Sequence, residues 1–209
     1  MNSPFTDPTG TWNRRFADEA FVFGTAPNAW LQAHAALWQP GQRVLCPADG
    51  EGRNSVWLAE RGLVVDAFDI SPVGVAKARR LASERGVSVN FTVSDCDGFR
   101  WPTAVYDGVA AIFVQFADPA LRERLFRHIV RSLRPGGVLV LQGYAPKQLE
   151  YKTGGPQQVA HLYTPELLRD AFHDLEIVTL EAYEAELSEG TGHRGRSALI
   201  GLVARRPVG

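Results

Sequence analysis

The sequence predicts an α/β protein with a mostly parallel sheet, helices on both faces and an antiparallel hairpin near its C-terminal end. Apolar strand patterns at 43–48, 64–70, 88–93, 106–113 and 136–143 are mostly separated by helical patterns at about 53–61, 72–85 and 119–133. This alternation is typical of parallel strands joined by crossover helices. Two long strand patterns at 175–186 and 196–205 follow with no helix between them, so we expect them to complete a seven-stranded sheet as an antiparallel pair.

The segments around this core have simpler patterns. Residues 1–11 are polar and contain two prolines, so we expect a mobile N-terminus. Residues 12–40 carry apolar side chains at helical spacing, with a turn signal at 24–28, and predict a helical lid. Thr164 followed by Pro165 predicts the start of another helix. We therefore expect one domain over residues 12–209, made of the lid (12–40) and an α/β core (43–206).

Composition narrows the classes of partner. The 209 residues are 45% hydrophobic and 22% charged, with a formal net charge of −1, so there is no global basic footprint, and the composition disfavours a nucleic-acid substrate without excluding it. No apolar run approaches the ~18 residues of a membrane span. Residues 1–7 show no basic region followed by an apolar block, so we expect no secretory signal. Cys46 and Cys96 fall at the ends of different predicted strands, which suggests buried thiols rather than a disulfide or a metal site. We expect a cytoplasmic protein, monomeric or homodimeric, that binds a small molecule.

The most informative motif is a glycine turn between a strand and a helix. The apolar run at 44–47 ends near Gly50 and Gly52, and a helical pattern begins directly after them. Glycines let the backbone pass close to a ligand, and the free N–H groups of the new helix point toward it. Asp69 ends the next strand pattern, nineteen residues after Gly50, where an acid can hold two ribose hydroxyls. The motif predicts an adenosine-bearing cofactor.

The charges around the turn indicate which cofactor. A dinucleotide fingerprint has a third glycine or alanine where this chain has Ser55. Asp49 and Glu51 would repel a diphosphate but suit the sulfonium and ammonium groups of S-adenosylmethionine. The residues alone leave two alternatives open: a turn that only closes a βα unit, and a nicotinamide-dependent reductase.

Five short motifs occur together in this chain, at Trp12–Phe16, Phe23–Asn28, Gly50–Ala59, Asp69–Ser71 and Leu133–Leu139. With this combination the chain resembles the class I S-adenosylmethionine-dependent methyltransferases, in the small single-domain branch near the tellurite-resistance-type enzymes. The resemblance covers about residues 12–206 and implies a Rossmann-like methyltransferase fold with S-adenosylmethionine as cofactor. The common loop pattern V-L-D-x-G-x-G-x-G is altered, because Cys46 and Ala48 replace its aspartate and first glycine. We interpret Asp49 as a relocated partner for the cofactor's ammonium group.

The resemblance implies roles for particular residues. Asp69 would hold the ribose, Ile70 would pack on the adenine, and Asp95 with Cys96 would contact the adenine edge, with Asp97 as an alternative to Asp95. The complete set of expected cofactor-binding residues is Asp49, Gly50, Glu51, Gly52, Asn54, Asp69, Ile70, Asp95, Cys96 and Phe113.

The same resemblance implies in-line displacement at the sulfonium methyl, which needs alignment and exclusion of water more than acid or base. Where the acceptor must lose a proton, His193 is the candidate base, and Arg194 or Arg196 is the candidate residue for holding an anionic acceptor. A polar hairpin loop at 188–196 with no catalytic role is the alternative. The expected substrate and lid residues are Trp12, Phe16, Phe23, Gln115, Tyr144, Tyr151 and Arg196.

We therefore expect an enzyme that transfers a methyl group to a small-molecule acceptor such as a thiol, an oxyanion or a hydroxylated metabolite. The alternative is a non-catalytic S-adenosylmethionine-binding regulatory protein, which the altered loop at Cys46 and Ala48 keeps open.

Overall fold

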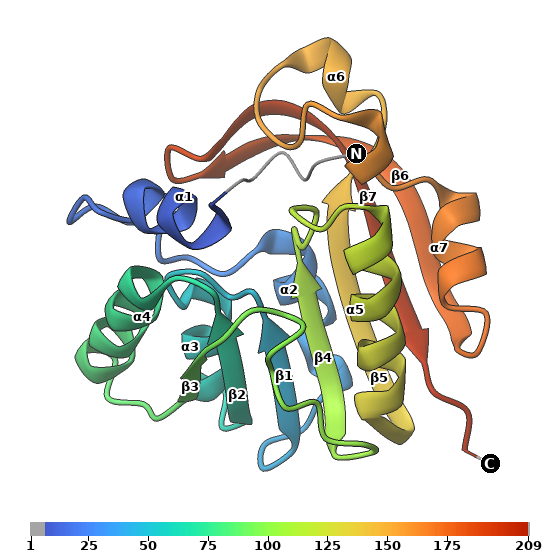
Figure 1. The fold of residues 1–209 in the computed structure, drawn as a ribbon. Helices are drawn as coiled ribbons and strands as arrows, with labels where there is room; N and C mark the ends of the chain where they lie inside the picture. The colour runs from blue at the N-terminus through green and yellow to red at the C-terminus, as the bar shows by residue number, and fades with distance from the viewer. Residues whose placement is uncertain (1–6, 209) are drawn as a thin grey trace.

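The computed structural model describes residues 7–208 and shows one seven-stranded sheet with the order β3-β2-β1-β4-β5-β7-β6 (Figure 1). Strands β1 to β5 run parallel, and β7 runs antiparallel to both β5 and β6. This confirms the predicted fold class, including the C-terminal hairpin. The strands are β1 (Arg43–Pro47), β2 (Val64–Asp69), β3 (Asn90–Val93), β4 (Tyr106–Ile112), β5 (Leu133–Tyr144), β6 (Glu176–Glu189) and β7 (His193–Arg205).

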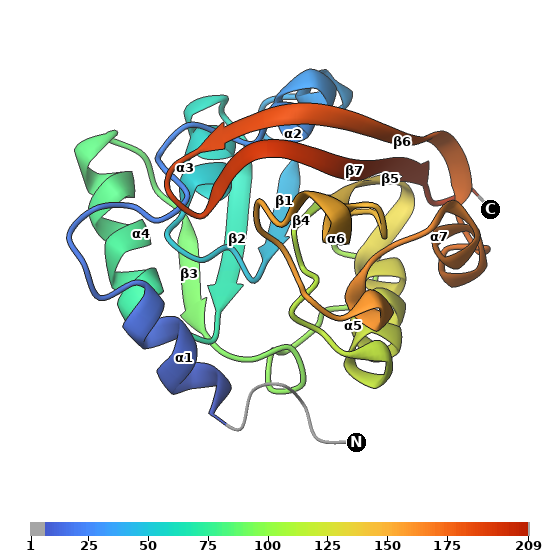
Figure 2. The same cartoon turned by 90° about the horizontal axis from the view of Figure 1, so that it is seen from above.

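Helices cover both faces of the sheet (Figure 2). Helices α5 and α7 pack on one face through a core that includes Leu125 and Leu168. Helices α2 and α3 pack on the other through Leu31 and Leu58, and α4 packs beside α3. The helices are α1 (Pro8–Arg15), α2 (Ala29–His34), η1 (Ala35–Leu37), α3 (Arg53–Glu60), α4 (Pro72–Glu84), α5 (Pro119–Ser132), α6 (Gln148–Tyr151), η2 (Val159–His161) and α7 (Pro165–Ala171).

Several of these helices begin where a polar side chain caps the first turn and a proline follows. Thr164 Oγ1 accepts a hydrogen bond from the backbone of Leu167 at 3.2 Å, as the Thr164–Pro165 pair predicts. Asp118 and Ser71 cap α5 and α4 in the same way. Such caps satisfy backbone N–H groups that have no partner inside the helix.

The elements differ from the sequence prediction mainly at their ends. Residues 1–6 lie outside the described part of the chain, but residues 8–11, which we expected to be mobile, form the first turn of α1. Residues 16–28 are irregular rather than helical. The hairpin is longer than predicted, because β6 and β7 stay paired out to Glu189 and His193. Within residues 7–208, no helix is long and apolar enough to cross a membrane.

The irregular segment after α1 is held in place by one buried lysine. Lys77 on α4 donates hydrogen bonds to the carbonyls of Asp18 at 2.8 Å and Ala20 at 2.7 Å, and it pairs with Glu51 at 2.5 Å. Val22 then bridges two other elements, because its N–H donates to Glu51 and its carbonyl accepts from Gly192 at 2.9 Å. These contacts fix the segment between the glycine turn and the tip of the β6–β7 hairpin.

Candidate active site

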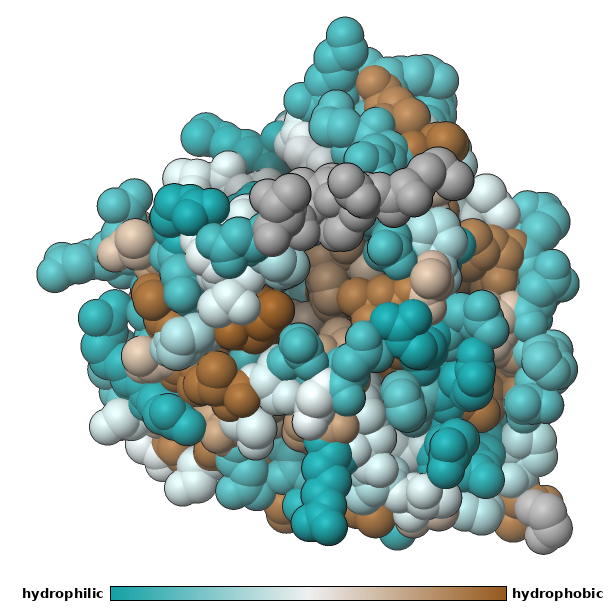
Figure 3. All heavy atoms as spheres, viewed as in Figure 1, coloured by the Kyte–Doolittle hydropathy of each residue, from teal (hydrophilic) through white to brown (hydrophobic). Residues whose placement is uncertain are grey.

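A cavity of about 620 Å³ lies at the carboxyl ends of β1, β2 and β4. Pro47, Asp69 and Ile112, which end or nearly end these strands, line it. Helix α1, the hairpin tip and residues 154–158 form another part of the wall. Figure 3 shows the hollowed face of the molecule, where apolar residues gather around the opening. Open α/β sheets commonly bind ligands at this edge, where the strand order changes direction.

The glycine turn lies on this wall and needs its glycines for two reasons. Gly50 and Gly52 have φ angles of 63° and 89°, in the region that side chains disfavour. A Cβ on Gly52 would lie 2.7 Å from the Cβ of Ala78, so this glycine lets α3 and α4 approach each other. A Cβ on Gly50 would lie 3.3 Å from the ring of Phe16, which covers the turn. Ala48, which replaces the first glycine of the common loop pattern, also has a positive φ of 50°.

Asp69 organises the turn from the end of β2. One carboxylate oxygen accepts from the N–H of Gly50 at 2.9 Å and the other from the N–H of Ser71 at 2.8 Å. Burial raises the pKa of Asp69, while these two hydrogen bonds oppose the shift. Each oxygen keeps a second acceptor site, so Asp69 can still accept hydrogen bonds from a ligand in the cavity that it lines.

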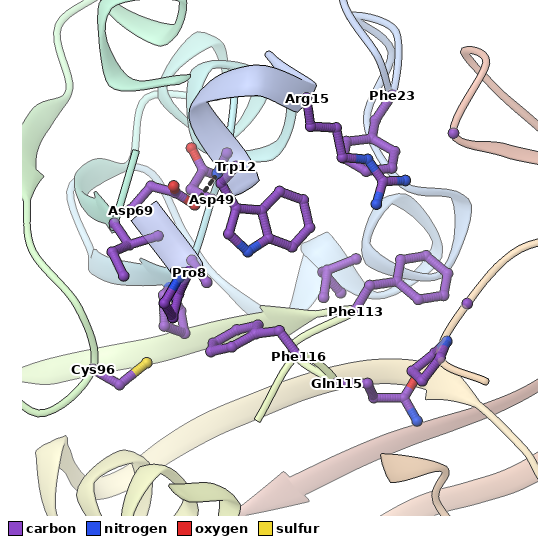
Figure 4. Close-up of a pocket in the computed structure, with 18 of the residues that line it drawn as sticks. Pro8, Trp12, Arg15, Phe23, Asp49, Asp69, Cys96, Phe113, Gln115 and Phe116 are labelled. Atoms are coloured by element: carbon purple, nitrogen blue, oxygen red, sulfur yellow. Dashed lines mark hydrogen bonds between the residues drawn. The ribbon is translucent and has the colours of Figure 1, made fainter. Parts of the chain in front are cut away.

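Asp49 lies near Asp69 on the same wall (Figure 4) and has an unsatisfied oxygen. The hydroxyl of Ser55 donates to its Oδ2, whereas the buried Oδ1 has no hydrogen-bond partner among residues 7–208. Burial, with a further contribution from Asp69, raises the pKa of Asp49 to about 7. A buried carboxylate oxygen without a donor is costly, so this atom is suited to a cationic or hydrogen-bonding group of a ligand.

Glu51 does not face the cavity, although the sequence analysis expected its charge to lie beside the cofactor. It is 3% exposed, pairs with Lys77 and accepts from Val22, and it does not line the cavity. Its charge is therefore used to hold the segment after α1. The second acid facing the cavity beside Asp49 is Asp69 rather than Glu51.

The far end of the cavity carries the expected adenine-contacting residues. Ile70, Asp95 and Cys96 line it, together with Asp97. Asp97 is held by two hydrogen bonds from Arg124, at 2.9 and 2.8 Å, which hold its pKa below the usual range. Asp95 accepts only from the N–H of Gly98 and is the freer of the two acids within the described residues. Burial raises the pKa of the Cys96 thiol to about 12, so it is present as the neutral thiol.

Aromatic rings surround a histidine at the opposite end. The ring of His193 lies 4.3 Å from Phe113, 4.5 Å from Phe23 and 5.7 Å from Tyr144, measured between ring centroids. His193 is buried, and its Nδ1 lies 3.1 Å from a carboxylate oxygen of Glu189. The buried hydroxyl of Tyr144 has no hydrogen-bond partner in the part of the chain described. This end of the cavity combines apolar surface with a base and a hydroxyl.

Comparison with known proteins identifies the family of this site. The family model described as "Methyltransferase domain" matches residues 44–137, which contain the glycine turn, Asp69 and Asp95. Residues 44–137 are a methyltransferase domain, in a chain with the fold of the class I S-adenosylmethionine-dependent methyltransferases. Two curated relatives agree with this. The chain is 34% identical over 113 residues to demethylmenaquinone methyltransferase of Thermus thermophilus, covering 53% of this chain and 51% of that protein. It is 37% identical over 124 residues to ribosomal RNA small subunit methyltransferase C of Chromohalobacter salexigens, covering 55% and 37%.

Solved structures confirm the methyltransferase fold. TehB from Haemophilus influenzae superposes with a TM-score of 0.71 at 15% identity, covering 95% of this chain and 66% of that chain. Magnesium protoporphyrin IX methyltransferase from Synechocystis, determined with bound S-adenosylhomocysteine, has a TM-score of 0.66 at 21% identity and covers 98% and 97%. The matched segments span about half or less of the two curated relatives, so the activity and the acceptor of this chain are treated as proposals below.

The structure brings most predicted residues of the methyltransferase site together. Five of the predicted residues do not line the cavity, namely Glu51, Gly52, Tyr151, Arg194 and Arg196. Alternation along β7 explains the arginines: His193 points inward, whereas Arg194 and Arg196 are exposed. Arg196 pairs with Glu184 and lies over the ring of Tyr151, which places all three on the surface. Gln115 lines the cavity, but its amide is occupied by the backbone of Tyr144 and His161.

The sequence prediction missed several residues of the methyltransferase site. Arg15 and Arg53, with Phe116 and His161, also line the cavity. The guanidinium of Arg15 lies 5.2 Å from the ring of Trp12 and 5.1 Å from that of Phe23, and points toward Phe23 in Figure 4. It has no carboxylate partner among the described residues. The motif Trp12–Phe16 contains Arg15 and was the available signal.

Proposed function

We propose that this methyltransferase domain transfers the methyl group of S-adenosylmethionine to a small-molecule acceptor by in-line displacement. The observation that carries the proposal is the unpartnered buried oxygen of Asp49, which lies beside the glycine turn and near Asp69. A pair of acids at this position suits a cationic nucleoside and disfavours a dinucleotide phosphate. When bound, the cofactor supplies a methyl group on a positively charged sulfur, which makes the methyl carbon open to attack.

The residues of the cavity fit the parts of this cofactor. Asp69 would accept hydrogen bonds from the ribose hydroxyls, and Asp49 would hold the ammonium group. Ile70 and Cys96 would pack around the adenine, with Asp95 at its polar edge. The remaining part of the wall, formed by α1 and the aromatic rings, would receive the acceptor and exclude water from it.

We propose for Arg15 the anion-holding role that the sequence suggested for Arg194 or Arg196. It lines the cavity, and burial lowers its pKa, although Tyr144 and Glu51 oppose the shift. A guanidinium without an acid partner is suited to a carboxylate or another anionic group. We propose that Arg15 holds a negatively charged group of a bound ligand.

The aromatic rings that cover part of the cavity support a small acceptor. Phe16 covers the glycine turn with an exposed fraction of 1%, and Phe23 packs against Gly192 of the hairpin tip. The net charge of −1 provides no general attraction for a polyanion. The acceptor classes we propose are a thiol, an oxyanion or a hydroxylated metabolite.

Incubation with S-adenosylmethionine and an acceptor panel tests this function. The panel contains thiols, phenols, tellurite and a total RNA fraction, and S-adenosylhomocysteine is measured. We expect its formation to depend on a small acceptor and, with an acceptor that must lose a proton, to fall at least about 100-fold in His193→Ala. Turnover with RNA alone would overturn the acceptor class. Cofactor binding without turnover on any acceptor would favour the regulatory alternative.

A further inference from the structure

Glu189, the last residue of β6, receives hydrogen bonds from three separate elements. Asn28 before α2 donates from Nδ2 at 3.0 Å, and Arg53 at the start of α3 donates from Nη2 at 2.9 Å. His193, the first residue of β7, completes the set with Nδ1 at 3.1 Å. Glu189 does not line the cavity, so this arrangement is not explained by contact with a ligand there.

These contacts fix the charge of the carboxylate. Burial by itself would raise the pKa of Glu189, but the hydrogen bond from His193 and the charge of Arg53 outweigh it and hold the pKa at about 2. The carboxylate is therefore ionised over the whole working range of pH and can only accept hydrogen bonds. The Nδ1 of His193 must then carry the proton, because two acceptors cannot share this contact.

The other ring nitrogen of His193 is consequently the free one. With the proton on Nδ1, the neutral ring has its lone pair on Nε2, and Nε2 makes no hydrogen bond to any residue from 7 to 208. His193 lines the cavity, and it lies among the rings of Phe23, Phe113 and Tyr144.

Burial and two neighbouring arginines favour the neutral form of His193. Burial lowers its pKa, and Arg53 from α3 and Arg15 from α1 lower it further. Glu189 from β6 is the group that raises it. Tyr144 from β5 has its own pKa raised by burial and remains protonated. A neutral imidazole at neutral pH can accept a proton from an acceptor molecule.

The hairpin tip holds the pair in this geometry. Glu189 and His193 are the last partners in the β6–β7 register, joined by the turn at 190–192. A Cβ on Gly190 would lie 2.3 Å from the carbonyl oxygen of Val22, and one on Gly192 would lie 2.4 Å from the ring of Phe23. The two glycines therefore allow the tip to pack directly against the segment after α1.

We propose that Glu189 is a positioning residue that makes Nε2 of His193 the proton acceptor, so that this enzyme methylates a protonated thiol or hydroxyl group. The inference rests on the proposed function. In the step, the proton of the acceptor passes to Nε2 while the acceptor atom forms a bond to the methyl carbon. The carbon–sulfur bond breaks, and its electrons return to sulfur to leave neutral S-adenosylhomocysteine.

The substitution Glu189→Gln tests the inference through the pH profile. Loss of the negative charge lowers the pKa of His193, so the acid limb of kcat should move to lower pH while its plateau falls about tenfold to 100-fold. A series of phenols with decreasing pKa adds a second readout. The loss of kcat in Glu189→Gln should be smaller for phenols that are already ionised at the assay pH, because these phenols need no base. Glu186 is an exposed acid on the same strand, so Glu186→Gln is the matched control. It should leave the pH profile of kcat and the rates with the phenol series unchanged.

Nitrogen NMR of His193 separates this inference from the proposed function, because it needs no turnover. We expect the Nδ1–H tautomer in the wild type and a lower pKa in Glu189→Gln. An Nε2–H tautomer in the wild type, or an equal deficit for all phenols with an unmoved acid limb, would overturn the role of Glu189. Absence of turnover with the predicted tautomer present would instead count against the proposed function alone.

Discussion

Asp49→Asn should weaken the binding of S-adenosylhomocysteine by about 10- to 100-fold at pH 8, because it removes a charge-assisted hydrogen bond of ~1.5–3 kcal/mol to the ligand's ammonium group. The wild-type affinity should also fall as the pH is lowered from 8 to 6. Burial raises the pKa of Asp49 to about 7, and only the ionised carboxylate can pair with the ammonium. In Asp49→Asn this pH dependence should disappear.

Calorimetric titration at pH 6, 7 and 8 measures both effects. Glu51→Gln is the informative comparison, because Glu51 pairs with Lys77 and does not line the cavity. It should keep the pH dependence. If Asp49→Asn instead keeps the pH dependence and Glu51→Gln loses it, the placement of the ammonium group beside Asp49 is wrong.

Thermal melting shows whether Asp49→Asn remains folded. It also tests the direction in which the substitution changes the melting temperature. The folded-state pKa of Asp49 is raised from 3.8 to about 7, so the folded protein binds this proton more tightly than the unfolded chain. Its contribution to stability is present below pH 4 and is lost as the pH rises through 7. The neutral asparagine avoids this loss, so the ligand-free variant should melt no lower than the wild type at pH 8.

Asp69→Asn should weaken binding of the same ligand by about 100-fold, because two hydrogen bonds from the ribose to a charged acceptor are altered. The asparagine amide has one oxygen, so it cannot accept from both Gly50 and Ser71 while also serving the ribose. The glycine turn should loosen as well. Calorimetry at 15 °C measures the affinity, after thermal melting has shown that the variant is folded at this temperature.

Asp66→Asn is the matched control for this substitution. Asp66 is also a buried acid on β2 and accepts hydrogen bonds from Arg43, Asn90 and Tyr106, but it does not line the cavity. Asp66→Asn should lower the melting temperature and leave the affinity of the folded protein for S-adenosylhomocysteine unchanged. An equal loss of affinity in both variants would show that Asp69 acts only through stability.

The sequence predicted those parts of the site that depend on local pattern. The glycine turn, Asp69 and the alternation of strands and helices in the core follow from short-range spacing, since a turn and the acid at the next strand end are set by neighbouring residues. The prediction of Thr164 as a helix cap was correct for the same reason.

The parts that it did not predict depend on contacts between distant residues. Arg53 and Glu189 are 136 positions apart and pair only because the hairpin folds back over α3. Glu51 appeared to face the ligand because nothing near it in sequence shows that Lys77 would pair with it. Arg194 and Arg196 appeared accessible to the site until the register of β7 placed them on the opposite face from His193.

Calorimetric titration of the wild-type protein with S-adenosylhomocysteine and with NADH tests the central claim most directly. Asp49 and Asp69 on one wall should admit the nucleoside with an ammonium group and reject the diphosphate. We predict saturable binding of S-adenosylhomocysteine and no heat of binding with NADH. Binding of NADH without binding of S-adenosylhomocysteine would contradict the assignment of this site.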